Sequence, residues 1–235
     1  MITITNEDNM QLMARYPDQY FDLAIVDPPY GINVSKLSYT QANNRSVKQK
    51  NGTTLKVKKL GYQHKDWDKE IPSLKYFNEV KRTSKNQIIW GWNYYGIDWG
   101  KGLIKWNKLV PEGVSFNTYE NAYCSLIDYE IEIKYLWAGF CQGVGFKNPE
   151  IQIGNKKLNE KRIHPTQKPV ILYKYLLDNY AKKGDKILDT HLGSGSIAIA
   201  CHDYGFDLTA CELDKDYFDA AIKRLKQHQS QTKLF

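Results

Sequence analysis

Four consecutive residues near the N-terminus, Asp27-Pro28-Pro29-Tyr30, combine a carboxylate, a stiff backbone and an aromatic ring. Neither proline can donate a backbone hydrogen bond, so the pair ends the apolar strand that precedes it. The Asp27 carboxylate and the Pro28 carbonyl are two acceptors on a rigid backbone, and together they can bind both hydrogens of an exocyclic amino group. The Tyr30 ring offers a face on which a planar base can stack.

Such a constellation can activate an amino group that is conjugated to a purine or pyrimidine. That amino group is a poor nucleophile because its lone pair is delocalised into the ring. Acceptors that draw its hydrogens out of the ring plane restore a lone pair directed at an electrophile. No strong base is needed, since the proton becomes acidic as the new bond forms. Positioning and charge stabilisation then supply most of the rate.

A glycine-rich turn late in the chain, Asp189 to Ser196 (DTHLGSGS), lies between an apolar strand and a helix. Gly193 and Gly195 allow the backbone to approach a ligand closely, and the start of the helix attracts negative charge. Glu212 ends the next strand, where a carboxylate can accept both ribose hydroxyls of a nucleoside. The turn lacks the full Gly-x-Gly-x-x-Gly of dinucleotide binders. The two features together predict a nucleoside cofactor.

A third stretch, HPTQKP, begins at His164 and precedes a helix. Thr166, Gln167 and Lys168 offer hydrogen-bond donors near the positive end of that helix, which suits a ligand that carries a carboxylate. No second histidine or cysteine lies at metal-ligand spacing from His164. We therefore interpret His164 as a structural or hydrogen-bonding residue and expect no metal.

The elements that must position these residues alternate between strands and helices. Apolar runs and helical spacing predict strands over 2–5, 22–26, 87–92, 102–107, 119–127, 186–188 and 208–211, and helices over 9–16, 71–84, 170–180, 196–204 and 215–227. This alternation predicts one α/β domain over 1–235, with a mostly parallel twisted sheet and helices on both faces. Ligand sites in such sheets lie at the carboxyl ends of the strands, where the three stretches fall.

The positive charge of the chain is concentrated in one segment. The chain has 33 Lys and Arg against 26 Asp and Glu, and the segment from Gly31 to Lys65 contains no acidic residue. We predict that residues 31–66 form a mobile basic loop that contacts a polyanion beside the site. Its eight basic residues are Lys36, Arg45, Lys48, Lys50, Lys56, Lys58, Lys59 and Lys65.

The remaining composition is that of an ordinary soluble protein. No segment approaches the ~18 apolar residues of a membrane helix, and MITITNEDNM lacks the basic start and apolar run of a secretion signal. The four cysteines form no Cys-x-x-Cys pair, so we interpret them as reduced thiols. We expect a cytoplasmic protein with no membrane partner.

The three stretches, in this order, resemble the S-adenosylmethionine-dependent DNA amino-methyltransferases. The catalytic motif comes first and the cofactor motif last, as in the permuted β group of that family. The resemblance spans almost the whole chain. It implies the Rossmann-like class I methyltransferase fold, S-adenosylmethionine as cofactor with S-adenosylhomocysteine as product, and DNA as partner. It also implies that a duplex base must flip out of the stack to reach the site.

The resemblance assigns roles residue by residue. The target amino group is assigned to the catalytic motif, Asp27, Pro28, Pro29 and Tyr30. The methionine part of the cofactor is assigned to Asp189, Gly193 and Gly195, its carboxylate to Thr166, Gln167 and Lys168, its ribose to Glu212 and its adenine to Asp8. Thr190 and Ser194 are also expected to bind the cofactor. One departure is clear: the family usually has Pro-Phe where this chain has Thr190-His191.

Residues 128–162 are where the resemblance places target recognition, and the segment is short. An Asp at the start of the catalytic motif is typical of adenine N6 enzymes, so we predict a site-specific adenine methyltransferase. A Ser there is more typical of cytosine N4 enzymes, which are the first alternative. An RNA or protein amide methyltransferase, or a nucleic-acid-binding protein without catalysis, would be of a different class. We expect a monomer or homodimer, with or without a cognate restriction endonuclease.

Overall fold

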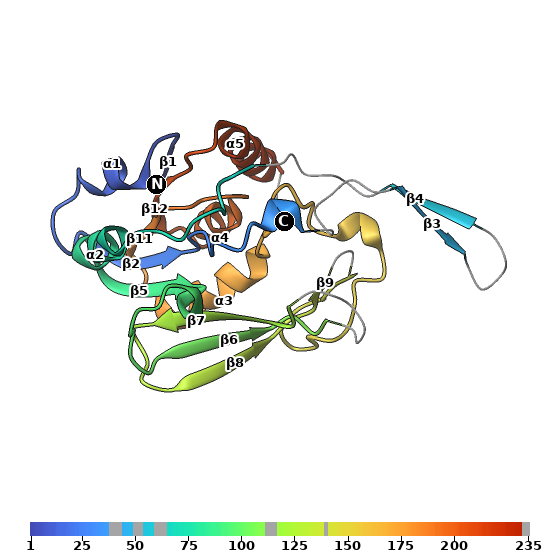
Figure 1. Cartoon of the computed structure of the whole chain (residues 1–235), viewed down its shortest axis with the longest axis horizontal. Coiled ribbons are helices and arrows are strands. Elements are labelled where there is room, and N and C mark those ends of the chain that lie inside the picture. Colours follow the sequence, from blue (N-terminus) through green and yellow to red (C-terminus); the bar gives the residue numbers. More distant parts are fainter. Residues whose placement is uncertain (38–43, 49–53, 59–64, 111–116, 139–140, 232–235) are drawn as a thin grey trace.

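The computed structural model describes residues 1–37, 44–48, 54–58, 65–110, 117–138 and 141–231, with only the backbone described for 44–48 and 54–58. Its centre is an eight-stranded sheet with the strand order β1-β12-β11-β2-β5-β7-β6-β8 (Figure 1). The strands are β1 (Ile2–Thr5), β2 (Phe21–Val26), β5 (Ser84–Trp90), β6 (Leu103–Asn107), β7 (Tyr119–Cys124), β8 (Glu130–Lys134), β11 (Lys186–Asp189) and β12 (Asp207–Cys211).

The sheet is mostly parallel. Neighbouring strands from β1 to β5 are parallel, and β7 runs antiparallel to both β5 and β6. Strand β8 pairs parallel with β6. From β11 the chain continues toward β12, whereas from β2 it continues toward β5, so the strand order reverses between β11 and β2. In open α/β sheets this reversal opens a crevice at the carboxyl ends of the two strands.

Helices cover both faces of the sheet (Figure 1). One face packs against α3 (Val170–Tyr180), α4 (Ser196–Tyr204) and α5 (Lys215–Gln229), and the other packs against α1 (Asn9–Met13) and α2 (Leu74–Thr83). Strand β2 shows why: Leu23 and Ile25 belong to the first core, and Ala24 and Val26 belong to the second. A strand buried on both faces must be apolar at successive positions.

Most predicted elements are confirmed, and two differences are informative. Inside the predicted basic loop, β3 (Asn44–Lys48) and β4 (Thr54–Lys58) form an antiparallel hairpin, which Figure 1 shows projecting away from the sheet. The prediction that this whole segment is a loop was wrong for these two stretches. Their charges hid short alternating patterns such as TLKVK, in which β-branched residues favour extended backbone.

The second difference is β8, which the sequence analysis left within the target-recognition segment 128–162. This strand pairs with β6 at the edge of the central sheet. Its sequence EIEIK alternates charged and apolar residues, as an edge strand with one buried face does. The rest of that segment includes β9 (Trp137–Ala138), β10 (Cys141–Gln142) and the short 3-10 helix η3 (Lys156–Leu158). No described helix is long and apolar enough to cross a membrane.

Candidate active site

The three predicted stretches meet at one cavity of about 290 Å3 at the carboxyl ends of β2, β11 and β12. The predicted residues that line this cavity are Asp27, Pro29, Thr166, Gln167, Lys168, Thr190, Gly193, Ser194 and Glu212. The cavity is therefore shared by the predicted catalytic motif and the predicted cofactor motifs. The other predicted residues of these motifs are not among the residues that line the cavity: Asp8, Pro28, Tyr30, Asp189 and Gly195.

Asp27 follows the last residue of β2 and is held on both oxygens. Its Oδ1 accepts a hydrogen bond of 2.6 Å from the Tyr30 hydroxyl, and its Oδ2 lies 2.6 Å from the Lys168 ammonium. Burial raises the pKa of the Asp27 carboxyl, and the Lys168 charge opposes that rise. A carboxylate fixed in this way has little freedom to rotate, and it still presents unused lone pairs to the cavity.

The contacts of Lys168 include partners that were not predicted. The sequence analysis assigned it to a cofactor carboxylate, whereas its Nζ contacts Asp27 and lies 3.1 Å from Glu120 Oε2. The Lys168 Nζ also donates to the Tyr30 hydroxyl at 3.1 Å. Only 2% of the Lys168 side chain is exposed, so its charge requires these partners. Glu120, on β7, is a site residue that the sequence analysis missed because it belongs to no motif.

The Tyr30 ring packs against aromatic neighbours, and the Lys168 ammonium lies 5.6 Å from its centroid. The ring stacks on Tyr94 with ring centroids 4.9 Å apart and an interplanar angle of 9°. Gly91 makes room for it, because a Cβ at that position would lie 2.2 Å from Tyr30 Cε1. Behind the ring, the Pro28 carbonyl accepts a hydrogen bond of 3.0 Å from the Tyr95 hydroxyl, so one of the two predicted acceptors already has a protein partner.

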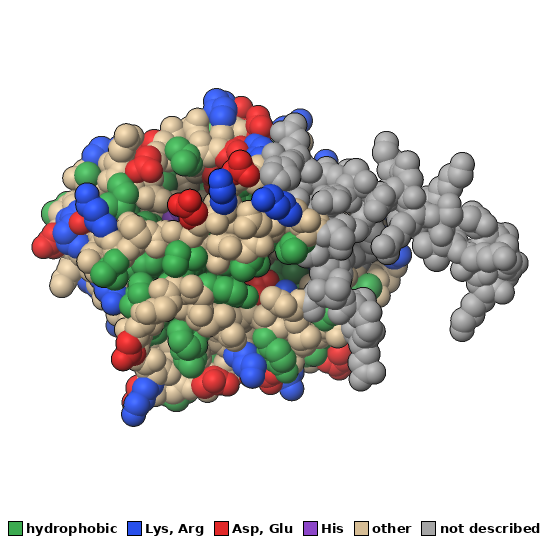
Figure 2. Space-filling model, in the orientation of Figure 1, with side chains coloured by type: hydrophobic (Ala, Val, Ile, Leu, Met, Phe, Trp, Pro, Cys, Tyr) green, Lys and Arg blue, Asp and Glu red, His purple; other side chains and the backbone are tan. Residues whose placement is uncertain are grey.

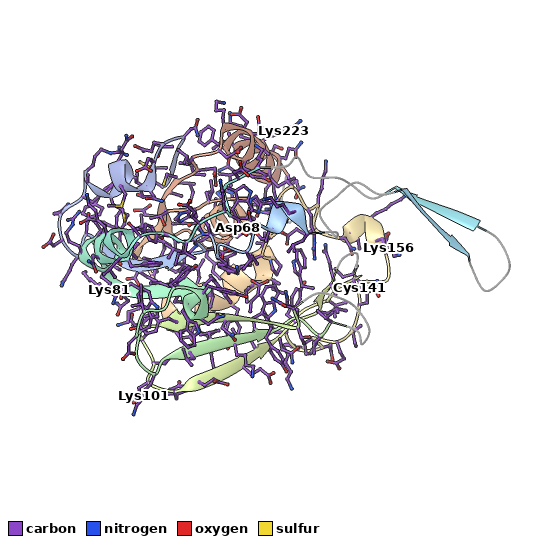
Figure 3. All side chains as sticks on the ribbon, in the orientation of Figure 1. Asp68, Lys81, Lys101, Cys141, Lys156 and Lys223 are labelled. Atoms are coloured by element: carbon purple, nitrogen blue, oxygen red, sulfur yellow. The ribbon has the colours of Figure 1, made fainter. Side chains whose placement is uncertain are left out.

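Asp68 is a second residue that the sequence analysis missed, and it fixes the loop that follows the catalytic motif. Its buried carboxylate accepts three backbone hydrogen bonds, from the N–H groups of Tyr30, Gly31 and Val34 at 2.8, 3.0 and 2.9 Å. Figure 3 labels Asp68 in the interior of the view, beside the short helix η1 (Val34–Lys36). The carboxylate thereby joins the end of the basic segment to its beginning.

The glycine-rich turn is tied to the next strand through Glu212. Its Oε2 accepts from the Gly193 N–H at 2.8 Å, and its Oε1 accepts from the Asp214 N–H at 2.9 Å. Gly195 has a φ of +72° and packs against α5, since a Cβ there would lie 3.1 Å from Ala221 Cβ. The second glycine of the turn thus serves helix packing, and the first lies at the cavity.

Asp189 and Asp8 use their carboxylates within the protein. Asp189 is 2% exposed and accepts from the His191 N–H at 3.0 Å, and burial raises its pKa to about 8. Asp8 caps helix α1 by accepting from the Met10 N–H at 2.8 Å. The residues on either side of Asp8, Glu7 and Asn9, line the cavity instead.

The departure Thr190-His191 forms a polar patch in the cavity wall. His191 Nε2 lies 3.1 Å from Asn9 Nδ2, and its Nδ1 lies 3.0 Å from Thr190 Oγ1. Burial lowers the pKa of His191 to about 3, so the ring is neutral. Thr190 Oγ1 also lies 2.7 Å from the Tyr76 hydroxyl. Hydrogen bonds here replace the packing that a Pro-Phe pair would supply.

His164 has the structural setting that the sequence analysis predicted. Its ring is buried between Trp67 and Tyr217, with centroid distances of 4.9 and 4.3 Å, and its Nδ1 lies 3.1 Å from Thr166 Oγ1. Burial lowers its pKa to about 3. Among the described residues no group of three or more His, Cys, Asp or Glu could hold a metal ion.

Of the eight predicted DNA-contacting residues, only Lys36 and Lys65 have described side chains. Lys36 is exposed, and Lys65 donates to Asp214 Oδ2 at 2.7 Å and to Asp216 Oδ2 at 2.8 Å, at the cavity rim. Arg45, Lys48, Lys56 and Lys58 lie on the hairpin strands, whose side chains are outside the description, and Lys50 and Lys59 lie outside the described residues altogether. DNA contact by this set stays a prediction.

Comparisons with known proteins agree with this geometry. The model of the family N6_N4_Mtase, described as DNA methylase, matches residues 43–223. The type II methyltransferase M2.DpnII of Streptococcus pneumoniae is 23% identical over 260 residues, which cover 95% of this chain and 89% of that protein.

Two solved structures share the fold. The M1.HpyAVI–SAM complex has a TM-score of 0.53 and 20% identity, covering 95% of this chain and all of that one. The cytosine-N4-specific PvuII DNA methyltransferase has a TM-score of 0.53 and 11% identity, and the match covers 97% of this chain and 90% of that one. The family match covers well over half of the sequence, and the chain belongs to the N6/N4 DNA methylase family.

Proposed function

We propose that this DNA methylase transfers a methyl group from S-adenosylmethionine to the N6 amino group of an adenine that is flipped out of the duplex. The observation that carries the proposal is that Asp27 and Glu212 line one cavity. An acceptor for an amino group thereby shares a single space with a carboxylate placed for a ribose. A transferase needs both substrates in contact in this way.

The cavity suits S-adenosylmethionine by the chemistry of its lining. Glu7, Glu212 and Asp214 place carboxylates around it, which favours a ligand with a positive sulfonium. Gly193 lines the cavity with a φ of +53°, a backbone conformation that residues with a side chain rarely adopt. When bound, this cofactor supplies an electrophilic methyl group, and its sulfur keeps the bonding electron pair as the methyl leaves.

The residues of the chain act on the amino group. Asp27 accepts one of its hydrogens, so that the nitrogen lone pair turns out of the ring plane toward the methyl carbon. As the nitrogen–carbon bond forms, the nitrogen becomes cationic and must lose a proton. The Asp27 carboxylate, whose pKa burial raises, is placed to receive it. We propose that the Tyr30 ring, which stacks on Tyr94, also supports the base by stacking.

Adenine is proposed over cytosine because the catalytic motif begins with Asp27. The fold does not discriminate, since the cytosine-N4-specific PvuII enzyme shares it. N4 methylation of cytosine is therefore the alternative that the experiment must separate. The name of the relative M2.DpnII as a type II methyltransferase supports a place beside a restriction endonuclease.

The test is incubation of the protein with methyl-labelled S-adenosylmethionine and unmethylated DNA, followed by nucleoside analysis. We expect labelled N6-methyladenine. Asp27→Ala should abolish transfer and retain cofactor binding, because the Ala side chain cannot accept a hydrogen bond from the amino group. Labelled N4-methylcytosine would show that the target base is cytosine and not adenine. Label on RNA or protein but not on DNA would overturn the proposal.

A further inference from the structure

The Lys168 ammonium is shared between two carboxylates that come from different elements. Asp27 follows β2, and Glu120 lies on β7. Their oxygens lie 2.6 and 3.1 Å from Lys168 Nζ. The aromatic ring of Trp90 covers the ammonium at 4.8 Å from its centroid, which keeps the group away from water. Asp27 and Lys168 line the cavity, whereas Glu120 does not.

We infer that Glu120 is a positioning residue for methyl transfer, which shares the Lys168 ammonium with Asp27 and so leaves the Asp27 carboxylate able to accept the target amino group. The inference rests on the proposed function. A buried ammonium with Asp27 as its only anion would form a one-to-one pair, and in a medium of low dielectric that pair is strong. The Asp27 carboxylate in such a pair would be a weaker acceptor for the hydrogens of the target amino group.

Glu120 is suited to this role because its carboxylate keeps its negative charge. Its Oε1 accepts from Lys108 Nζ at 3.0 Å, while its Oε2 faces Lys168. The two lysines overcome the effect of burial and lower its pKa to about 2. Glu120 is therefore ionised over the whole pH range in which the protein can be assayed, and Lys108 holds it in place.

Apart from the carboxylates that line the cavity with Asp27, the ionisable groups packed around Asp27 carry little charge near neutral pH. The phenols of Tyr30, Tyr76 and Tyr173 have pKa values raised well above the ordinary value by burial, and burial raises that of Tyr95 too. Burial also raises the pKa of Asp189 to about 8. Apart from the cavity carboxylates Glu7, Glu212 and Asp214, the charges near Asp27 are thus Lys168 at first contact, with Glu120 and Lys108 behind it.

Glu120→Gln should therefore produce two changes together. Lys168 then pairs with Asp27 alone. Because a nearby negative charge has been removed, the pKa of Asp27 falls, and the acid limb of the pH–rate profile moves to lower pH by about one unit. The plateau rate falls by about tenfold because Lys168 now consumes the charge of the Asp27 carboxylate. Affinity for S-adenosylmethionine should stay unchanged, since Glu120 does not line the cavity.

Lys108→Met is the matched control. It removes a positive charge from the same network, so the pKa of Asp27 rises and the acid limb moves to higher pH. A general loss of packing cannot move the limb in opposite directions in two variants. Denaturant unfolding of both variants verifies that they are folded.

The experiment is single-turnover transfer of labelled methyl groups into DNA, with saturating cofactor and DNA, from about pH 5 to pH 9. Glu120→Gln with an unchanged limb, or with a limb that moves in the same direction as in Lys108→Met, overturns the inference. If the wild-type protein transfers no methyl group to DNA, the proposed function fails instead. Carbon-13 NMR titration of the Asp27 carboxyl, assigned with Asp27→Asn, then decides: an Asp27 pKa unaltered by Glu120→Gln overturns the inference.

Discussion

The position of the Tyr30 ring depends on the absence of a side chain at Gly91. Gly91→Ala would place a Cβ within 2.2 Å of the ring at a φ of +71°, so the ring must leave its place against Tyr94. The hydrogen bond from the Tyr30 hydroxyl to Asp27 is then lost. We expect methyl transfer to fall by at least about tenfold with cofactor affinity retained, measured by steady-state kinetics and calorimetry.

Gly96→Ala is the matched control for that substitution. Gly96 has a φ of +63°, and a Cβ there would meet no atom within 4 Å. This variant carries the same cost of about 1 kcal/mol for an alanine in the left-handed region without touching Tyr30. Equal losses of activity in both variants would show that backbone strain, and not the ring, is responsible.

Asp189 couples stability to pH, because its carboxyl has a pKa of about 8 in the folded protein and about 4 in an unfolded chain. Between these values folding takes up a proton, so the free energy of unfolding falls as pH rises, by up to ~1.4 kcal/mol per pH unit. Asp189→Asn should remove this slope while keeping the acceptor for the His191 N–H. Urea unfolding of both proteins at pH 5 and pH 8 measures the difference, and parallel slopes would contradict the assignment.

At the scale of elements, Asp68 fixes the start of the basic segment against its end. Asp68→Asn keeps one oxygen but turns an NH2 group toward one of three backbone N–H donors. We expect a loss of about 1–3 kcal/mol in unfolding free energy and a fall in kcat that exceeds any change in cofactor affinity. Asp66→Asn, at an exposed position nearby, is the control and should leave both unchanged.

Much of the element order could be predicted from sequence because apolar period and helix caps are local signals. β1, α3 and α4 have the predicted bounds, and α5 begins at its Asp214 cap as expected. Helix α2 begins at Leu74, two residues after Pro72, and not at Ile71, because its N-cap is Ser73. Strands β4 and β8 were missed because charged residues occupy alternate positions and conceal the strand pattern. Strand β3 was missed because it is short and mostly polar.

In the site, too, features with a local sequence signal were predicted and features that depend on distant contacts were not. The motifs that line the cavity were found because each carries its own chemistry, and because the catalytic motif and the glycine-rich turn also follow strands. The partners Glu120, Asp68 and Gly91 were missed because their roles arise only from distant packing. The predicted contact of Lys168 with a cofactor carboxylate stays a prediction, and the contact of Lys168 with Asp27 was missed because the sequence cannot show where its side chain reaches.

At the scale of the whole molecule, both signs of charge are dispersed over the body. Figure 2 shows hydrophobic side chains gathered across the centre of one face, with Lys, Arg, Asp and Glu around them. The excess of positive charge belongs to the segment 31–65, because the remaining residues include 25 basic and 26 acidic side chains. Binding to DNA should therefore depend on that segment more than on the body.

Neutralising Lys56, Lys58 and Lys59 with glutamine should weaken DNA binding and reduce the slope of log affinity against log salt by up to about 3. The control replaces Lys101, Lys183 and Lys223, which are exposed on the body; Figure 3 labels the first and the last at its edges. Fluorescence anisotropy with a labelled duplex at several salt concentrations measures both. Identical slopes in the two triple variants would contradict a DNA-contacting role for the segment.

The Asp68 carboxylate also bears on how a chain of this kind can diversify. It joins Tyr30 and Val34 to the far end of the basic segment, so the two ends stay together whatever sequence connects them. The entropic cost of closing a loop rises only slowly with its length. The sequence and the length of the segment between its two ends are therefore not fixed by the catalytic motif. We expect that its length and sequence can change while the catalytic motif keeps its position.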